Sequence, residues 1–208
     1  MTKLNGRVAL VTGAGRGIGR AISLALAEAG ARVVVAARSA DELDLIVSEI
    51  GETGGTATAL TVDLSQRDES REFISRASEP FGPIDILVNN AGSRPGKDRV
   101  LVLELEEEAF DEVQRVNVRG TFLVSKAVAT HMVGRGGGGK IINISSGAGK
   151  KGIAKYAAYC ASKFAVIGWT QAMAQELSLI PHCRCRRLLT FRSGSYPDHQ
   201  TTQKTAPP

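Results

Sequence analysis

The sequence predicts an α/β fold, namely a doubly wound parallel sheet with strand order 3-2-1-4-5. Apolar runs of strand length alternate with helical patterns five times along the chain. Such runs are typical of strands that helices cover on both faces, and right-handed crossovers then produce the doubly wound arrangement. No repeat or low-complexity linker divides the 208 residues, a length that suits one domain with a sizeable core.

Each element is recognised by its apolar pattern and its boundary residues. The first strand is expected at residues 7–12 and the first helix at 17–29, with Gly13 and Gly30 as their end signals. Further strands are expected at 32–37, 56–62, 84–89 and 140–145, and further helices at 39–54, 66–79, within 106–133 and at 155–179. The run GRGGGG at 134–139 precedes a strand, so we interpret it as a flexible turn and not as a phosphate cradle, which uses a helix N-terminus.

Composition and charge exclude several classes of protein. The chain is 43% hydrophobic and 23% charged, and no apolar run reaches the ~18 residues of a membrane span. The N-terminus lacks the features of a signal peptide, and the odd count of three Cys does not suggest a disulfide framework, so a cytoplasmic location is predicted. Of the net charge of +5, residues 181–208 carry +4, which leaves no basic face for a nucleic-acid partner on the main body.

A glycine-rich turn, TGAGRGIG at residues 12–19, joins the first strand to the first helix. Gly13 and Gly15 allow a tight turn, Gly17 allows the backbone to approach a pyrophosphate, and Gly19 allows close packing. The helix behind the turn presents free N–H groups and a partial positive charge. This strand–turn–helix context predicts a dinucleotide site of the Rossmann type.

Two arginines favour NADP over NAD as the cofactor. NAD sites usually carry an acidic residue near the end of the second strand, whereas this strand ends in Ala37, followed by Arg38 and Ser39. Arg16 lies within the glycine turn, and two guanidinium groups near one ribose suit a 2′-phosphate. Asp63, after the third strand, could accept a hydrogen bond from adenine or could cap the next helix, and the sequence leaves both open.

Six motifs occur together along the chain: TGAGRGIG at 12–19, VDL at 62–64, NNAG at 89–92, VNV at 116–118, ISS at 144–146 and YCASK at 159–163. In order and spacing they resemble the short-chain dehydrogenases/reductases, with the bacterial 3-oxoacyl-carrier-protein reductases and related carbonyl reductases most similar. The resemblance covers residues 1 to about 179. It implies an oxidoreductase acting on a small-molecule carbonyl or alcohol, with a catalytic Asn, Ser, Tyr and Lys.

Spacing selects the tyrosine of that set. Tyr159 lies four residues before Lys163, one helical turn, so the two side chains share a face of the predicted helix. Tyr156 lies seven residues before Lys163, which is two turns away and too far to act with it. In the family the active serine precedes the tyrosine by thirteen residues, which implies Ser146, with Ser145 as the alternative.

The chemistry of carbonyl reduction suits these residue types. A hydride from the nicotinamide and a proton for the oxygen are both needed. A free phenol ionises only near pH ~10, and a neighbouring ammonium such as that of Lys163 stabilises its charged form. Ser146 can donate a hydrogen bond to the developing oxyanion. The resemblance alone implies that Lys163 also binds the nicotinamide ribose and that Asn117 holds a water for proton relay.

The resemblance also assigns the NNAG motif and the quaternary structure. Asn90, Ala91 and Gly92 are expected to line the cofactor, and Asn89 to tie neighbouring strands together. Helix pairing in the family implies a homodimer or homotetramer, with no membrane partner. The complete cofactor-binding set expected is Gly13, Gly15, Arg16, Gly17, Ile18, Gly19, Arg38, Ser39, Asp63, Leu64, Asn90, Ala91, Gly92, Tyr159 and Lys163.

The chain changes character after Leu179. Residues 181–208 hold four of the seven Pro, two of the three Cys and two of the three His, and the sixth and seventh strands of the family are not recognisable there. We therefore predict a dinucleotide-binding and catalytic domain at 1–180 and an irregular, disordered basic tail at 181–208. A frame-shifted or alternatively spliced end would explain the change, and sequencing of the coding DNA tests that hypothesis.

The sequence leaves two functional interpretations and predicts no metal site. The first is an NADP-dependent enzyme that interconverts a carbonyl and a secondary alcohol. The alternative is a truncated, catalytically silent NADP-binding protein, because the substrate-holding region of the family is not recognisable. The segment HCRC at 182–185 has no partner cluster of ligands and is not interpreted as a metal site.

Overall fold

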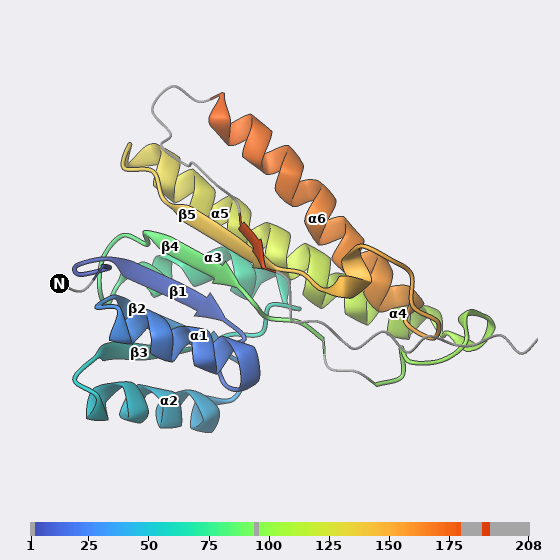
Figure 1. Cartoon of the computed structure of the whole chain (residues 1–208), viewed down its shortest axis with the longest axis horizontal. Helices are drawn as coiled ribbons and strands as arrows, with labels where there is room; N and C mark the ends of the chain where they lie inside the picture. Colours follow the sequence, from blue (N-terminus) through green and yellow to red (C-terminus); the bar gives the residue numbers. More distant parts are fainter. Residues whose placement is uncertain (1–2, 94–95, 180–188, 192–208) are drawn as a thin grey trace, which may run out of the picture.

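A computed structural model describes residues 3–93, 96–179 and 189–191. Within these residues one parallel sheet has the strand order β3-β2-β1-β4-β5-β6, with helices on both faces (Figure 1). The predicted order 3-2-1-4-5 is therefore confirmed. The strands are β1 (Val8–Thr12), β2 (Arg32–Ala37), β3 (Thr56–Thr61), β4 (Ile86–Asn89), β5 (Lys140–Ile144) and β6 (Leu189–Phe191).

The helices follow the predicted alternation. They are α1 (Gly17–Glu28), α2 (Ala40–Glu52), α3 (Arg67–Ser78), α4 (Glu107–Gln114), α5 (Thr121–Gly134) and α6 (Ala157–Ser178). Short 3₁₀ turns occur at Val102–Glu104 and Gly147–Gly149. The stretch predicted as helical at 106–133 is α4 and α5 joined by a π-helical turn, Arg115–Gly120.

The expectation that the sixth strand is missing is wrong, because a short strand of three residues is present. Leu189–Phe191 forms β6, which pairs parallel to β5 with Ile142 opposite Leu189. The free N–H and C=O groups at the edge of β5 offer pairing to any extended segment nearby, and Leu, Thr and Phe suit a strand. Residues 180–188 and 192–208 lie outside the described part, so the domain boundary at 180 and the disorder of the tail stay predictions.

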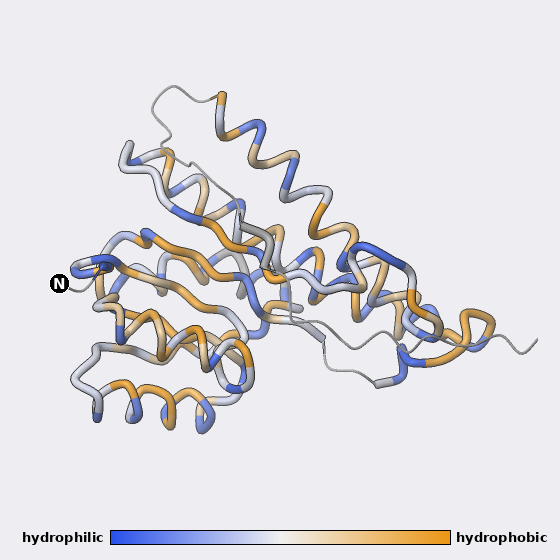
Figure 2. Tube along the Cα trace, viewed as in Figure 1, coloured by the Kyte–Doolittle hydropathy of each residue, from blue (hydrophilic) through white to orange (hydrophobic). Residues whose placement is uncertain are grey.

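Two apolar layers hold the helices to the sheet. Successive strand residues face opposite sides, so Leu10 joins the core shared with α3 and α5, and Val11 joins the core shared with α1 and α2. Both side chains are fully buried. Figure 2 shows the corresponding hydrophobic colour along the inner strands. In the described part of the chain, no helix is both long and apolar enough to cross a membrane.

A buried polar network lies on the face of the sheet that α5 and α6 cover. The Asn89 amide donates to Asn143 Oδ1 at 2.8 Å and to Ser125 Oγ at 2.7 Å, and the Asn143 amide donates to Thr170 Oγ1 at 2.9 Å. These bonds join β4 to β5 and the sheet to α5 and α6. The prediction that Asn89 ties neighbouring strands together is confirmed.

Candidate cofactor and active site

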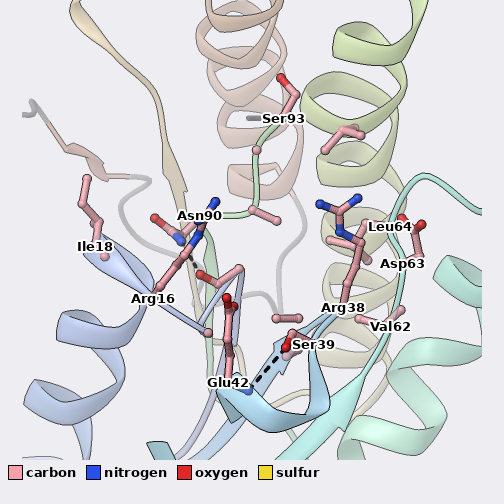
Figure 3. Close-up of a pocket in the computed structure, with 18 of the residues that line it drawn as sticks. Arg16, Ile18, Arg38, Ser39, Glu42, Val62, Asp63, Leu64, Asn90 and Ser93 are labelled. Atoms are coloured by element: carbon pink, nitrogen blue, oxygen red, sulfur yellow. Dashed lines mark hydrogen bonds between the residues drawn. The ribbon is translucent and has the colours of Figure 1, made fainter. Parts of the chain in front are cut away.

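A cavity of about 700 Å³ opens at the carboxyl ends of the strands (Figure 3). This is the edge of an open α/β sheet where ligands usually bind. We call it the cofactor cavity and define it by its lining residues: Gly13, Gly15, Arg16, Gly17, Ile18, Ala36, Ala37, Arg38, Ser39, Glu42, Val62, Asp63, Leu64, Asn90, Ala91, Gly92, Ser93, Glu112 and Val116.

The glycine turn forms the floor of this cavity because only glycines fit there. Gly13 has φ of +63°, and a Cβ on it would lie 2.7 Å from the Ala91 Cα. A Cβ on Gly19 would lie 2.2 Å from the Gly13 carbonyl oxygen. The Asn90 amide donates to the carbonyls of Thr12 and Gly13 at 3.2 and 3.0 Å. The turn is thus fixed against the NNAG motif.

The first turn of α1 is open to an anion. Its N-cap, Arg16, makes no side-chain capping bond, and no acidic residue lies in the first turn. Gly17 and Ile18, which begin the helix, line the cavity. Free N–H groups and the helix dipole favour a phosphate at such a position. At another wall, Ser93 Oγ is buried without a hydrogen-bond partner among the described residues, so a ligand could supply one. The cavity therefore fits a dinucleotide.

Three charged side chains surround the place expected for the adenosine ribose. Arg16 projects from the glycine turn, and Arg38 reaches up from the end of β2 beside Leu64 (Figure 3). Glu42, which the sequence analysis did not assign, also lines the cavity, and its carboxylate would lie 2.5 Å from a Cβ on Gly15. The two predicted guanidinium groups therefore share the cavity with the Glu42 carboxylate, and Asp63 and Glu112 line it as well.

Asp63 and Leu64 line the cavity beside Val62. Asp63 Oδ1 accepts a hydrogen bond from the Ser65 N–H at 2.9 Å, and the N-cap residue of α3 is Gln66. Asp63 thus stabilises the turn before α3 rather than capping that helix directly. The wall that Asp63 forms belongs to the same cavity as the glycine turn.

The predicted tyrosine and lysine share one face of α6. Lys163 Nζ lies 5.6 Å from the centre of the Tyr159 ring and donates to the Ile144 carbonyl at 3.0 Å. The lysine is buried, with 6% of its surface exposed. Desolvation by burial lowers the pKa of Lys163 from 10.5 to about 8. A cation held in this way is placed to act on the phenol beside it.

A hydrogen-bond chain connects this pair to the cofactor cavity. The Ser93 N–H donates to Asn117 Oδ1 at 2.7 Å, and the Asn117 amide donates to Ser162 Oγ at 3.0 Å. Ser162 Oγ donates in turn to the Tyr159 carbonyl at 2.7 Å. Asn117 lies in the π-helical turn, a feature that often occurs at functional sites. Because Ser93 lines the cavity, this series of hydrogen bonds joins the cavity wall to α6.

The two candidate serines have different partners. Ser145 Oγ is buried and donates to the Lys163 carbonyl at 3.1 Å. Its proton is therefore used in a hydrogen bond that joins the end of β5 to α6. Ser146 Oγ accepts from the Ala148 N–H at 3.2 Å, which leaves its own proton available to a ligand. This difference favours Ser146 as the donor to a substrate oxygen.

Comparison with known proteins matches the part of the chain that contains these sites. The family model for short chain dehydrogenases matches residues 7–180. The chain belongs to this family.

Individual members show how much is shared. A short-chain dehydrogenase/reductase of Armillaria gallica is 43% identical over 85% of this chain and 67% of its own length. A 3-oxoacyl-[acyl-carrier-protein] reductase of Synechocystis is 44% identical over 86% of this chain and 71% of its own. The crystal structure of a metagenomic short-chain oxidoreductase in complex with NADP superposes with a TM-score of 0.83 at 38% identity, covering 92% of this chain and 84% of the other.

In this short-chain dehydrogenase, the structure brings most of the predicted cofactor set to one cavity. Gly19 lies outside the lining because it packs on the turn, and Tyr159 and Lys163 lie on α6 beyond the cavity. Glu42 was missed, although Ser39 and Glu42 form the pattern S-x-x-E that marks a helix start. Ser93, Glu112 and Val116 were also missed, because tertiary packing alone brings them to the site.

Among the described residues, no group of three potential metal ligands lies together.

Proposed function

We propose that this short-chain dehydrogenase is an NADP(H)-dependent oxidoreductase that interconverts a carbonyl and a secondary alcohol. The observation that carries the proposal is the hydrogen-bond chain from the cavity wall to α6. It runs from the Ser93 N–H through Asn117 and Ser162 to the backbone carbonyl of Tyr159, and so positions the helix on which Lys163 is buried beside the Tyr159 ring. A dinucleotide site and an acid/base site joined in this way suit hydride transfer coupled to proton transfer.

The bound nicotinamide supplies or accepts the hydride. In the reducing direction the Tyr159 hydroxyl donates the proton that the carbonyl oxygen needs. The Lys163 ammonium beside the ring stabilises the phenolate that remains. Ser146 donates a hydrogen bond to the same substrate oxygen, because its Oγ uses only acceptor capacity within the protein. In the oxidising direction the same groups act in reverse.

The test begins with binding and continues with turnover. NADPH fluorescence should change on mixing with the protein, and a panel of ketones should then lower the absorbance at the nicotinamide band. Tyr159→Phe should abolish this turnover while NADPH binding persists, because the phenol transfers a proton and does not shape the cavity. Turnover that survives in Tyr159→Phe would remove Tyr159 from the proposed role.

Arg16 and Arg38 would supply the preference for NADP. Charge-assisted contacts to a phosphate are strong, so Arg38→Ala should weaken NADPH binding by ~10-fold or more and change NADH binding little. A matched control is Arg20→Ala, because Arg20 lies on α1, pairs with Glu49 and does not line the cavity. Equal losses for both cofactors in Arg38→Ala would contradict the preference.

One observation favours the alternative of a silent NADP-binding protein. All residues that line the cofactor cavity lie between Gly13 and Val116, so the cavity is formed without the C-terminal part of the chain. NADPH binding without turnover of any carbonyl would support that alternative. We also propose a homodimer or homotetramer, and the cytoplasmic location stays a prediction from the sequence.

A further inference from the structure

A second cation lies against the proposed catalytic tyrosine. The guanidinium carbon of Arg99 is 3.6 Å from the centre of the Tyr156 ring and 4.9 Å from the centre of the Tyr159 ring. The two rings meet edge to face, with centres 6.4 Å apart. The guanidinium therefore occupies the notch between them, on the loop that connects β4 to α4.

The protein fixes this arginine in place. Arg99 Nε donates to Asp98 Oδ2 at 3.2 Å, and the Asp98 side chain is 4% exposed. The other Asp98 oxygen accepts from the Gly96 N–H at 2.9 Å, and the Arg99 N–H donates to the Gly96 carbonyl at 3.1 Å. A guanidinium held by one carboxylate and two rings loses little freedom when it binds a ligand.

The arginine still has donors to offer. Nε is occupied by Asp98, and within the described part of the chain the terminal nitrogens make no hydrogen bond. The side chain is 19% exposed, so a ligand can reach it. The segment 146–163, which carries both tyrosines, has four lysines and no acidic residue, whereas α4, which packs on α6, carries four acidic residues. Recognition of an anion therefore depends on the guanidinium itself.

We propose that Arg99 binds a carboxylate of the substrate, so that the preferred substrates are short oxo acids and the corresponding hydroxy acids. This inference rests on the proposed function, because Tyr159 would act on the carbonyl while Arg99 holds the acid group. The planar guanidinium matches a carboxylate through two parallel hydrogen bonds. The contact with the Tyr159 ring places the acid group a few bonds from the reacting carbon.

Matched acids and esters test this assignment. Pyruvate, acetoacetate and levulinate are each compared with their methyl esters as substrates with NADPH. For at least one pair, kcat/KM for the acid should exceed that for the ester by ~10- to 100-fold, the range of a hydrogen bond to a charged group. In Arg99→Gln this ratio should fall to near one, while kcat/KM for the ester changes little. Arg99→Lys should restore part of the ratio.

Two further variants separate charge recognition from folding. The double variant Arg99→Gln, Asp98→Asn leaves no unpaired buried carboxylate and should lose the acid preference as the single variant does. Lys97→Gln removes an exposed cation two positions away and should keep the preference. An acid-to-ester ratio near one in the original protein, or a ratio that persists in both Arg99 variants, overturns the proposal. Parallel losses for acid and ester overturn it too, because Arg99 would then only orient Tyr159.

A binding measurement keeps the inference separate from the proposed function. If no carbonyl is turned over, the proposed function fails, and calorimetric titration of the same acids into the protein with NADP⁺ then decides on Arg99. Heat of binding that Arg99→Gln weakens by ~10-fold or more would support the anion site. The absence of binding, or equal binding by both proteins, would end the proposal.

Discussion

The burial of the charged Lys163 side chain lowers the free energy of unfolding by an amount that depends on pH. Burial holds its pKa at about 8 in the folded chain, against 10.5 for an exposed lysine. Between these values the unfolded chain binds more protons than the folded one, so the free energy of unfolding should rise as the pH rises from 8 to 10.5. The full rise corresponds to ~3 kcal/mol. Below pH 8 both states are protonated and the penalty is constant.

Denaturant unfolding at several pH values measures this effect. Lys163→Met should be more stable than the original protein at pH 7, and the difference should shrink toward pH 10.5. Comparing the two proteins cancels the titration of other groups. A difference that does not change with pH would show that Lys163 is not held with a lowered pKa.

Glu42 is a residue whose removal should improve cofactor binding. Its carboxylate lies over the glycine turn, where a bound phosphate would meet like charge. Glu42→Gln should therefore tighten NADPH binding several-fold, and more for NADPH than for NADH. Asp44→Asn, an exposed position on the same helix, should change neither affinity. Weaker NADPH binding in Glu42→Gln would mean that Glu42 contacts the cofactor favourably, for example through ribose hydroxyls.

At the scale of the element, the glycine turn and α1 are fixed by one steric contact. A Cβ on Gly19 would lie 2.2 Å from the Gly13 carbonyl oxygen, whereas a Cβ on Gly168 in α6 would meet nothing within 4 Å. Both positions are helical, so alanine is intrinsically favoured over glycine by ~1 kcal/mol at each. Gly168→Ala should raise the free energy of unfolding by about that amount. Gly19→Ala should lower both this free energy and NADPH affinity, as measured by denaturation and fluorescence. An equal gain in both variants would contradict the steric role of Gly19.

The elements that could be predicted are those with a local pattern. Alternating apolar runs located β1 to β5, and the glycine turn located the cofactor cavity, because both depend on neighbours in sequence. The π-helical turn at Arg115–Gly120 has no such pattern. It accompanies tertiary contacts, namely the hydrogen bonds of Asn117 and the packing of Gly120, where a Cβ would lie 2.9 Å from the Leu64 carbonyl oxygen.

Two other features could not be predicted from the sequence, because they too depend on tertiary contacts. β6 exists through pairing with the edge of β5, and its three residues carry too little pattern to stand out. In the sequence, Arg99 is a single basic residue in a loop, and only tertiary packing brings it against Tyr156 and Tyr159. The motif spacing did predict that Tyr159 and Lys163 share a face, because both lie on one helix.

At the scale of the whole molecule, apolar side chains remain uncovered on α5 and α6. Phe122 is 44% exposed and stacks edge to face on Trp169, and Phe164 is 46% exposed. Figure 2 shows a further hydrophobic segment where the chain between β4 and α4 projects from the body, and Leu103 there is 96% exposed. Exposed apolar side chains that lie together on neighbouring helices are a common mark of a protein–protein interface.

Burial of the α5 and α6 faces between two copies would explain this exposure. Light scattering after size exclusion should then give a mass of two or four chains of 22.0 kDa. The double variant Phe122→Glu, Phe164→Glu should give a single-chain mass, because charges on both helices cannot be buried unpaired. Leu45→Glu is the matched control, since Leu45 is 72% exposed on α2, across the sheet. A single-chain mass for the original protein would contradict the oligomer. A double variant that stays assembled would place the interface on another surface, with the projecting Leu103 segment the next to substitute.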